Sequence, residues 1–224
     1  MRPAWQSSPI FLGMSQSDIK SCLECSGAKI LRYNKDEMIF SQQRAPKKLL
    51  ILLEGSVVVG SDSSSGKRSI IAAFDQPGEL FAEVFLFVDS DDHDQYAQAV
   101  EPCAVLQIPR EFLYQPCGHG CGCHSKMIAN MLSILARKAY FLSRKLQIVS
   151  CATLRQKIAK LLLEESFSPE KPVRLMKREE MADFLNVTRP SLSRELMKMQ
   201  KDGILKVEKR EISIADYQRL QELL

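Results

Sequence analysis

Cysteine and histidine side chains are concentrated in one short stretch of this chain. From Cys117 to His124 the sequence reads Cys-Gly-His-Gly-Cys-Gly-Cys-His, which puts three thiols and two imidazoles within eight residues. Thiolates and imidazoles bind zinc, copper and iron–sulfur clusters. The spacing matches neither a standard zinc site nor a haem attachment site. If a metal binds here, we expect its ligands to be Cys117, Cys121, Cys123 and His124.

Four interpretations of this stretch are open. It is a metal sensor, a thiol-redox sensor, a reduced loop that only connects two elements, or the nucleophile loop of a thiol enzyme that uses Cys117 or Cys121. The enzyme interpretation lacks a recognisable oxyanion site or substrate cleft, so we expect no enzymatic activity. The residues alone identify no cofactor beyond a metal at this stretch.

Basic side chains follow a helical spacing in the segment 189–202. Leu192, Leu196 and Met199 would share one face at i, i+4 and i+7, which leaves arginine and lysine for the other side. Arginine can donate two hydrogen bonds to guanine, and lysine suits phosphates. The alternative is an ordinary solvated helix face. We expect DNA contacts from Thr188, Arg189, Ser191, Ser193, Arg194, Lys198 and Lys206.

The elements around this segment have the order of a winged helix-turn-helix. Thr188 is a candidate N-cap, and Pro190 is tolerated in a first helical turn, where N–H groups have no intrahelical partner. The expected helix, turn, second helix, helix-ending glycine and hairpin cover residues 179–185, 186–187, 189–202, 203 and 204–214.

A long helix is expected over residues 125–150. Apolar residues recur there at alternating steps of four and three, as at the seam between two paired helices. A single buried helix is the alternative, but the sustained period favours a homodimer. The seam residues are Ile128, Leu132, Leu135, Ala139, Leu142, Leu146 and Val149.

Short strands dominate the region from Ala28 to Ile108. Runs with β propensity alternate with turn signals such as Gln76-Pro-Gly78, and no long helix interrupts them. Many short strands of this kind predict a small sandwich or barrel. The expected strands are 29–33, 38–40, 49–53, 56–60, 69–74, 80–82, 96–100 and 104–108.

The whole chain resembles the Crp/Fnr family of bacterial transcription regulators. The motifs that carry the resemblance are Lys177 to Leu196 (KREEMADFLNVTRPSLSREL), Asp202-Gly-Ile-Leu205, Leu52-Leu-Glu-Gly-Ser-Val57, Gly66, Gly78 and the strand from Ala99 to Pro109. Thr188, Arg189, Ser193 and Arg194 occupy the family's recognition-helix positions. Pro190 stands where well-known members carry a base-reading glutamate, so their DNA half-site is not carried over to this chain.

The resemblance implies an α+β fold in three parts. The first part, over 1–124, is a cyclic-nucleotide-binding-like β-roll, which is a double-stranded jelly-roll barrel. The second part is a dimerisation helix over 125–150, and the third is a winged helix-turn-helix DNA-binding domain over 151–224. It also implies a double-stranded DNA operator, a second copy of the chain, RNA polymerase and a small effector as partners.

Cyclic AMP is not the expected effector. Cyclic-AMP-binding members carry a Gly-Glu-Leu stretch and, further on, an Arg-Ser-Ala stretch that pairs with the phosphate. Here the first is Ala82-Glu-Val84 and the second is His93-Asp-Gln95, so the bidentate arginine is missing. The alternative, that this pocket binds no effector and only supports the fold, is equally open. The candidate pocket residues are Glu83, His93, Tyr96 and Leu142.

Composition adds little to this interpretation. The net charge is +4 and the hydrophobic content is 45%, which suits a globular protein and is compatible with nucleic acid. The sequence shows no secretory signal and no stretch for a membrane span, so a cytoplasmic location is expected. We expect an effector-gated homodimeric regulator, with metal or redox sensing by the cysteine loop as the alternative and a plain interaction scaffold as the last possibility.

Overall fold

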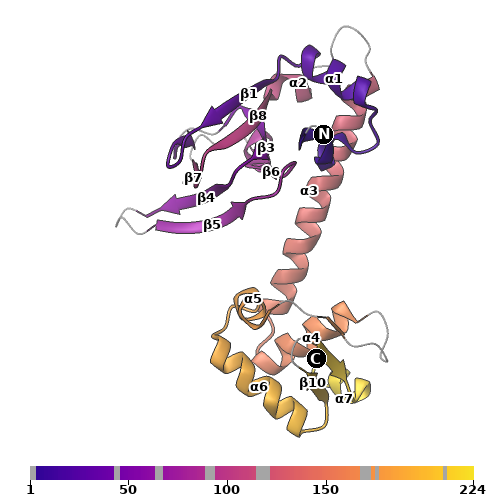
Figure 1. Cartoon of the computed structure of the whole chain (residues 1–224). Helices are drawn as coiled ribbons and strands as arrows, with labels where there is room; N and C mark the ends of the chain where they lie inside the picture. The colour runs from indigo at the N-terminus through magenta and orange to yellow at the C-terminus, as the bar shows by residue number, and fades with distance from the viewer. Residues whose placement is uncertain are drawn as a thin grey trace. The chain divides into compact units, whose positions relative to one another are not determined.

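The computed structural model describes residues 4–42, 46–63, 68–88, 94–114, 122–166, 173–174, 177–208 and 211–224. It divides into two compact units, Met1–Ala136 and Arg137–Leu224. Figure 1 traces the chain through both units. None of the helices in the described part of the chain combines the length and the apolar character that a membrane span requires.

Two antiparallel four-stranded sheets build the first unit. Their strand orders are β1-β8-β3-β6 and β2-β7-β4-β5. The sheets enclose a core that includes Leu52, Val59 and Val105, as expected for a β-roll. The strands are β1 (Lys29–Tyr33), β2 (Met38–Phe40), β3 (Lys48–Glu54), β4 (Val57–Asp62), β5 (Arg68–Phe74), β6 (Leu80–Phe81), β7 (Gln95–Ala99) and β8 (Cys103–Pro109).

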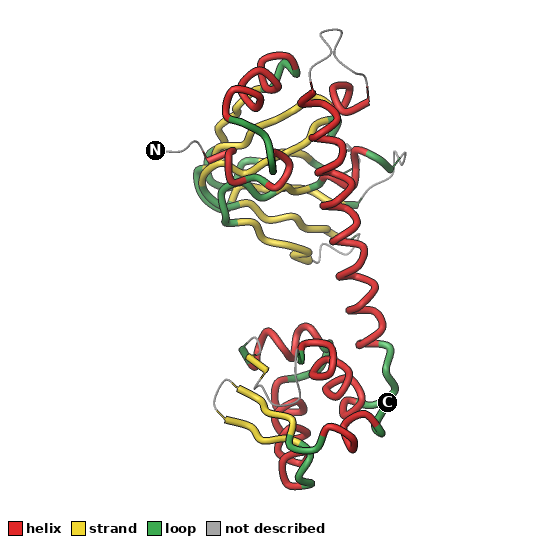
Figure 2. Tube along the Cα trace, turned by 90° about the vertical axis from the view of Figure 1, so that its right-hand side faces the viewer, coloured by secondary structure: helices red, strands yellow, loops and turns green. Residues whose placement is uncertain are grey.

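Helices cover the outer face of the first sheet. Ile51 and Leu106 of this sheet pack in one buried cluster with Met127 and Met131 of the first half of α3, and Figure 2 shows these helices against the strands. Ser15 caps α1 through a reciprocal capping box with Asp18. The helices are η1 (Ala4–Ser7), η2 (Pro9–Phe11), α1 (Gln16–Cys25), η3 (Glu83–Leu86), α2 (Arg110–Tyr114) and α3 (Gly122–Val149).

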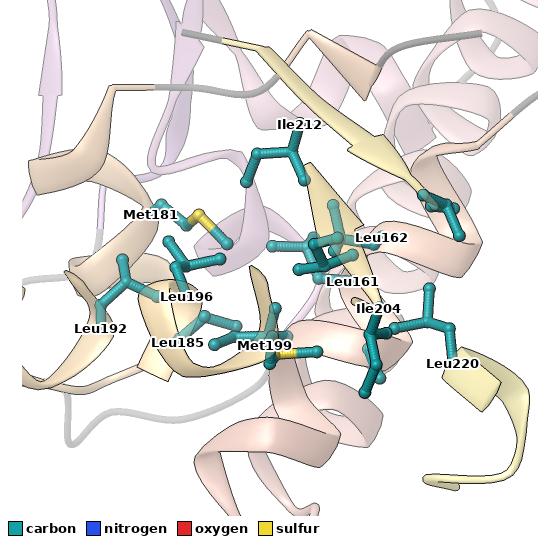
Figure 3. Packing of buried hydrophobic residues seen from close by; sticks show 14 of the residues in the cluster. Leu161, Leu162, Met181, Leu185, Leu192, Leu196, Met199, Ile204, Ile212 and Leu220 are labelled. Atoms are coloured by element: carbon teal, nitrogen blue, oxygen red, sulfur yellow. The ribbon is translucent and has the colours of Figure 1, made fainter. Parts of the chain in front are cut away.

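The second unit is built around one apolar cluster. Leu162, Met181, Leu196 and Ile212 come from four different elements and are all buried, and Figure 3 shows how they pack. The strands form a sheet of order β10-β11-β9. The elements are α4 (Leu154–Glu165), β9 (Val173–Arg174), α5 (Arg178–Phe184), α6 (Arg189–Lys201), β10 (Leu205–Glu208), β11 (Glu211–Ile214) and α7 (Tyr217–Gln221).

The predicted fold class is confirmed, with differences in detail. The short helices η3 and α2 were not expected from the sequence, and α3 begins at Gly122 instead of residue 125. The division between the two units falls inside α3, after Ala136. The domain bounds 1–124, 125–150 and 151–224 stay a prediction.

Candidate nucleic-acid interface

Thr188 starts the helix α6 as its N-cap. Its backbone is extended, with φ −74° and ψ 141°. The Thr188 hydroxyl oxygen accepts a hydrogen bond from the backbone N–H of Ser191 at 3.4 Å and lies 2.9 Å from the Ser191 hydroxyl. Pro190 occupies the first turn, where its missing N–H has no cost. These residues therefore begin α6 at Arg189.

The turn before α6 depends on Asn186. Its φ is +53°, in the left-handed region that asparagine tolerates better than most residues. The turn lets α5 and α6 share one core through Met181, Leu192 and Leu196. This buried side holds α6 in place, so its other side is left for contacts with a partner.

The exposed side of α6 is cationic. Arg194 and Lys198 are exposed, whereas Ser191 and Ser193 are half-buried. The Arg194 guanidinium donates to the Pro190 carbonyl oxygen and to the Ser191 hydroxyl, both at 3.4 Å. It therefore points back toward the N-terminus of α6, where expected DNA contacts gather. Arg189 forms an exposed ion pair with Glu179 of α5 at 3.0 Å.

Sequence reasoning missed one residue on this side, Met197. Its side chain is 60% exposed, and it lies on the same open face of α6 as Arg194 and Lys198. Met197 lies outside the apolar i, i+4, i+7 stripe of this helix, and this position could have predicted its exposure. An exposed thioether among basic groups can contact the apolar methyl group of thymine.

Arg155 of α4 is a second residue that the sequence did not single out. Its guanidinium pairs with Glu195 at 2.6 Å and with Asp202 at 2.8 Å, which are near the middle and at the end of α6. The hydrogen bond that the Arg155 guanidinium donates to the Glu195 carboxylate is the main cause that raises the pKa of Arg155. Nothing in the linear sequence pairs residues this far apart. Arg155 therefore positions α6 relative to α4.

Lys206 lies in the hairpin that forms the wing. It is exposed on β10 and its ammonium lies 2.9 Å from a carboxylate oxygen of Glu208. The hydrogen bond to Glu208 raises the pKa of Lys206. The lysine is therefore charged and accessible, as a phosphate contact requires.

The seam of α3 is largely uncovered within one chain. Leu132, Leu142 and Leu146 are 63%, 62% and 64% exposed. Leu135 differs because it is half-buried and packs against the core of the first unit. Phe141 packs edge-on against Phe184 of α5, with ring centroids 6.0 Å apart.

The described residues of the expected effector pocket lie in different local environments. Glu83 is 2% exposed and follows Ala82, whose φ of +59° belongs to the region that glycine prefers. The Tyr96 ring is buried, and the Arg68 guanidinium carbon lies 5.1 Å from its centroid. Leu142 lies in the second unit, and His93 lies outside the described residues.

The expected metal ligands are only partly described. Cys117 and Cys121 lie outside the described residues. Cys123 and His124 form the first turn of α3, and both are buried. The Cys123 thiol donates to the Asp18 carbonyl oxygen at 3.4 Å, whereas the His124 ring packs against Phe112 at 5.1 Å. No group of three or more metal-binding side chains forms among the residues that the structure describes.

Two family models match this chain. Residues 30–118 match the cyclic nucleotide-binding domain, and residues 156–223 match the Crp-like helix-turn-helix domain. The first range contains the β-roll strands except for Lys29, the first residue of β1, and the second range contains α5 and α6.

Relatives resemble the chain over most of its length. The cyclic AMP receptor protein of Thermus thermophilus is 23% identical, over 97% of this chain and 97% of its own. The fumarate and nitrate reduction regulatory protein of Vibrio cholerae is 25% identical, over 84% of this chain and 76% of its own. The crystal structure of the Thermus thermophilus catabolite activator protein has a TM-score of 0.53 at 23% identity, and covers 96% of this chain and 98% of that one.

The fold, the helix-turn-helix and the family matches together identify this chain as a DNA-binding transcription regulator and not as an enzyme. The chain belongs to the Crp/Fnr family, with a cyclic nucleotide-binding-like domain ahead of its DNA-binding domain.

Proposed function

We propose that this protein acts in the cytoplasm as a homodimeric, effector-gated regulator that inserts α6 into the DNA major groove. The observation that carries the proposal is the division of α6 into a buried apolar side and an exposed basic side. Arg189 and Arg194 read base edges, while Lys198 and Lys206 contact phosphates. Thr188, Ser191 and Ser193 complete the contact surface. RNA polymerase is the expected further partner.

Dimerisation is supported by the exposed leucines of α3. Leu132, Leu142 and Leu146 present apolar surface to water in the single chain, and a second copy of the helix would cover it. Two copies present two recognition helices, which suits an operator with two half-sites.

The test is a titration of the whole protein with a selected operator and with a scrambled duplex. We expect Arg194→Ala to lose about 1–3 kcal/mol of binding free energy on the operator and little on the scrambled DNA. Lys198→Ala is the matched control, because loss of a phosphate contact should weaken both duplexes alike and reduce the salt dependence. Equal losses on both duplexes for Arg194→Ala would exclude base reading by Arg194.

A second candidate signal input is the cysteine loop, with Cys117, Cys121, Cys123 and His124 as metal ligands or redox thiols. One observation favours it. His124 Nδ1 is buried and has no hydrogen-bond partner in the described chain, so a metal or a loop residue would satisfy it. A single ion that binds both Cys123 and His124 needs a local change, because neighbouring helix residues point in directions about 100° apart.

Operator binding under reducing, oxidised and zinc-loaded conditions tests this input. We expect the Cys121→Ser, Cys123→Ser double variant to keep its DNA affinity under all three conditions, whereas the wild type changes. Identical wild-type affinity under all three conditions would assign the loop a structural role and leave the β-roll as the place of the effector site.

A further inference from the structure

A cavity of about 610 Å³ lies between the two sheets of the β-roll. Its described walls come from β1, β3 and β8 of one sheet, from β2 of the other, and from Ser41, Pro46 and Lys47 between β2 and β3. Its volume is within the usual range for small-molecule sites, about 300–1,000 Å³. Glu83, Tyr96 and Leu142 are not among its described lining residues, so it is distinct from the expected effector pocket.

A chain of hydrogen bonds lines the polar side of this cavity. The Lys48 ammonium donates to Gln107 Oε1 at 2.8 Å, and Gln107 Nε2 donates to the Tyr33 hydroxyl oxygen at 2.7 Å. Lysine can only donate, so this contact fixes the orientation of the Gln107 amide. The Tyr33 oxygen is used as an acceptor, and its own hydrogen is left to donate elsewhere.

Gln107 holds this arrangement because it is 5% exposed on a central strand. Burial is the main cause that raises the pKa of the Tyr33 phenol, so Tyr33 keeps its proton at neutral pH and stays a donor. The cavity therefore presents an ammonium and a phenolic hydroxyl held at fixed positions.

The charge of this cavity is not balanced by its own walls. Lys47 and Lys48 both line it, and its described lining includes no aspartate or glutamate. Among the described residues, Lys48 forms no ion pair. The nearby Glu37 acts on Tyr33 only through its charge, and its carboxylate accepts from the Asn34 N–H at 2.8 Å. Both lysines are exposed, and the positive charge that they give the cavity favours an anionic ligand over a neutral one.

The remaining described walls are apolar apart from Ser41. Leu31 and Leu50 contribute from the first sheet, and Met38, Ile39 and Phe40 contribute from β2. A bare inorganic anion would leave this surface in contact with water. A ligand with one anionic end and an apolar body would use both sides of the cavity.

We propose that this cavity binds a small organic carboxylate with an apolar body, such as a medium-chain fatty acid. The carboxylate accepts hydrogen bonds from Lys48 and Tyr33, and the body packs against Leu31, Phe40 and Leu50. Gln107 is a positioning residue for both donors. The binding itself needs neither DNA nor a dimer, so it is measured independently of the proposed regulatory role.

Calorimetry of the full chain with octanoate tests the proposal, with octanol as the neutral ligand of equal chain length. We expect one octanoate per chain with a Kd of about 10–100 µM, and octanol at least about tenfold weaker. Lys48→Met keeps the apolar stem and should weaken octanoate about tenfold without changing octanol. Tyr33→Phe should weaken octanoate by about threefold to tenfold.

Lys20→Met on the exposed side of α1 carries the same charge change and should leave the octanoate affinity unaltered. Several outcomes would overturn the proposal. These are no saturable octanoate binding up to about 1 mM, equal effects of Lys48→Met and Lys20→Met, or octanoate binding that neither Lys48→Met nor Tyr33→Phe alters. The last outcome would mean that octanoate binds elsewhere on the chain.

Discussion

At the scale of single residues, the beginning of α6 depends on Thr188. Its hydroxyl accepts from the Ser191 N–H, one of the first N–H groups of α6, which have no carbonyl partner inside the helix. Because Arg194 also donates to Ser191, the cap and the exposed arginine belong to one small network. A change at the cap should therefore affect both stability and DNA binding.

We expect Thr188→Ala to lower the free energy of unfolding by about 1 kcal/mol, because the hydroxyl that satisfies this N–H is lost. Thr188→Ser keeps the hydroxyl, so its free energy of unfolding should fall much less. Urea unfolding of the full chain, followed by circular dichroism, measures the difference. Equal stability of the alanine variant and the wild type would mean that the cap contributes nothing.

At the scale of elements, α6 is held by Arg155 as well as by its apolar side. Both Glu195 and Asp202 pair with the same guanidinium, so α4 and the second half of α6 are joined at two points. The Glu195 side chain is only 18% exposed, and removal of its partner leaves a half-buried carboxylate without compensation.

Arg155→Met should lower the free energy of unfolding by about 1 kcal/mol at low salt. The loss should shrink as ionic strength rises, because salt screens a partly exposed pair. Lys160→Met on the same helix controls for the change in charge. Denaturant curves at low and high salt provide the measurement, and a loss identical to that of Lys160→Met would contradict this role.

The exposed leucines of α3 allow a test of dimerisation that spares the core of each unit. We expect Leu142→Lys to give a monomer in size-exclusion chromatography with light scattering, because a lysine buried in the seam costs at least about 2 kcal/mol. Leu135 is unsuitable, since it packs against the core of the first unit. Tyr140→Lys, exposed but outside the seam, is the control. A Leu142→Lys variant that stays dimeric at the same protein concentration would exclude this seam.

At the scale of the whole molecule, the chain has the fold of a cyclic nucleotide-binding-like domain, whereas its expected effector pocket differs in sequence from that of cyclic-AMP-binding members. Asp94 stands where cyclic-AMP-binding members carry a serine, and its carboxylate accepts from the Ser61 hydroxyl at 3.2 Å. We propose that this carboxylate would repel a cyclic phosphate, and that the effector is therefore not cyclic AMP.

We expect cyclic AMP to produce no saturable heat at micromolar concentrations, and about 1 mM cyclic AMP to leave the operator Kd unchanged. Asp94→Ser removes the repelling charge, and a small gain in affinity for that variant alone would support the role of Asp94. Micromolar binding by the wild type, with a lower operator Kd, would contradict the prediction.

The sequence by itself determined the class of protein and the order of its main elements, though not the short helices η3 and α2. The spacing of Leu132, Leu135 and Ala139 at steps of three and four, the i, i+4, i+7 stripe of Leu192, Leu196 and Met199, and the capping position of Thr188 are local patterns. Local patterns can be read without coordinates because helix and strand periods fix which side chains share a face. The resemblance of the whole chain to Crp/Fnr regulators rests on the same local order.

Only the tertiary structure decided which distant residues meet. Arg155 reaches Glu195 and Asp202 from another helix, and Lys48, Gln107 and Tyr33 come together from three strands of one sheet. Leu135 and Leu142 read alike in the heptad, yet one packs into a core and the other is exposed. Strand order and helix packing set these contacts, and neither follows from spacing along the chain, because non-local contacts depend on how the whole core is filled.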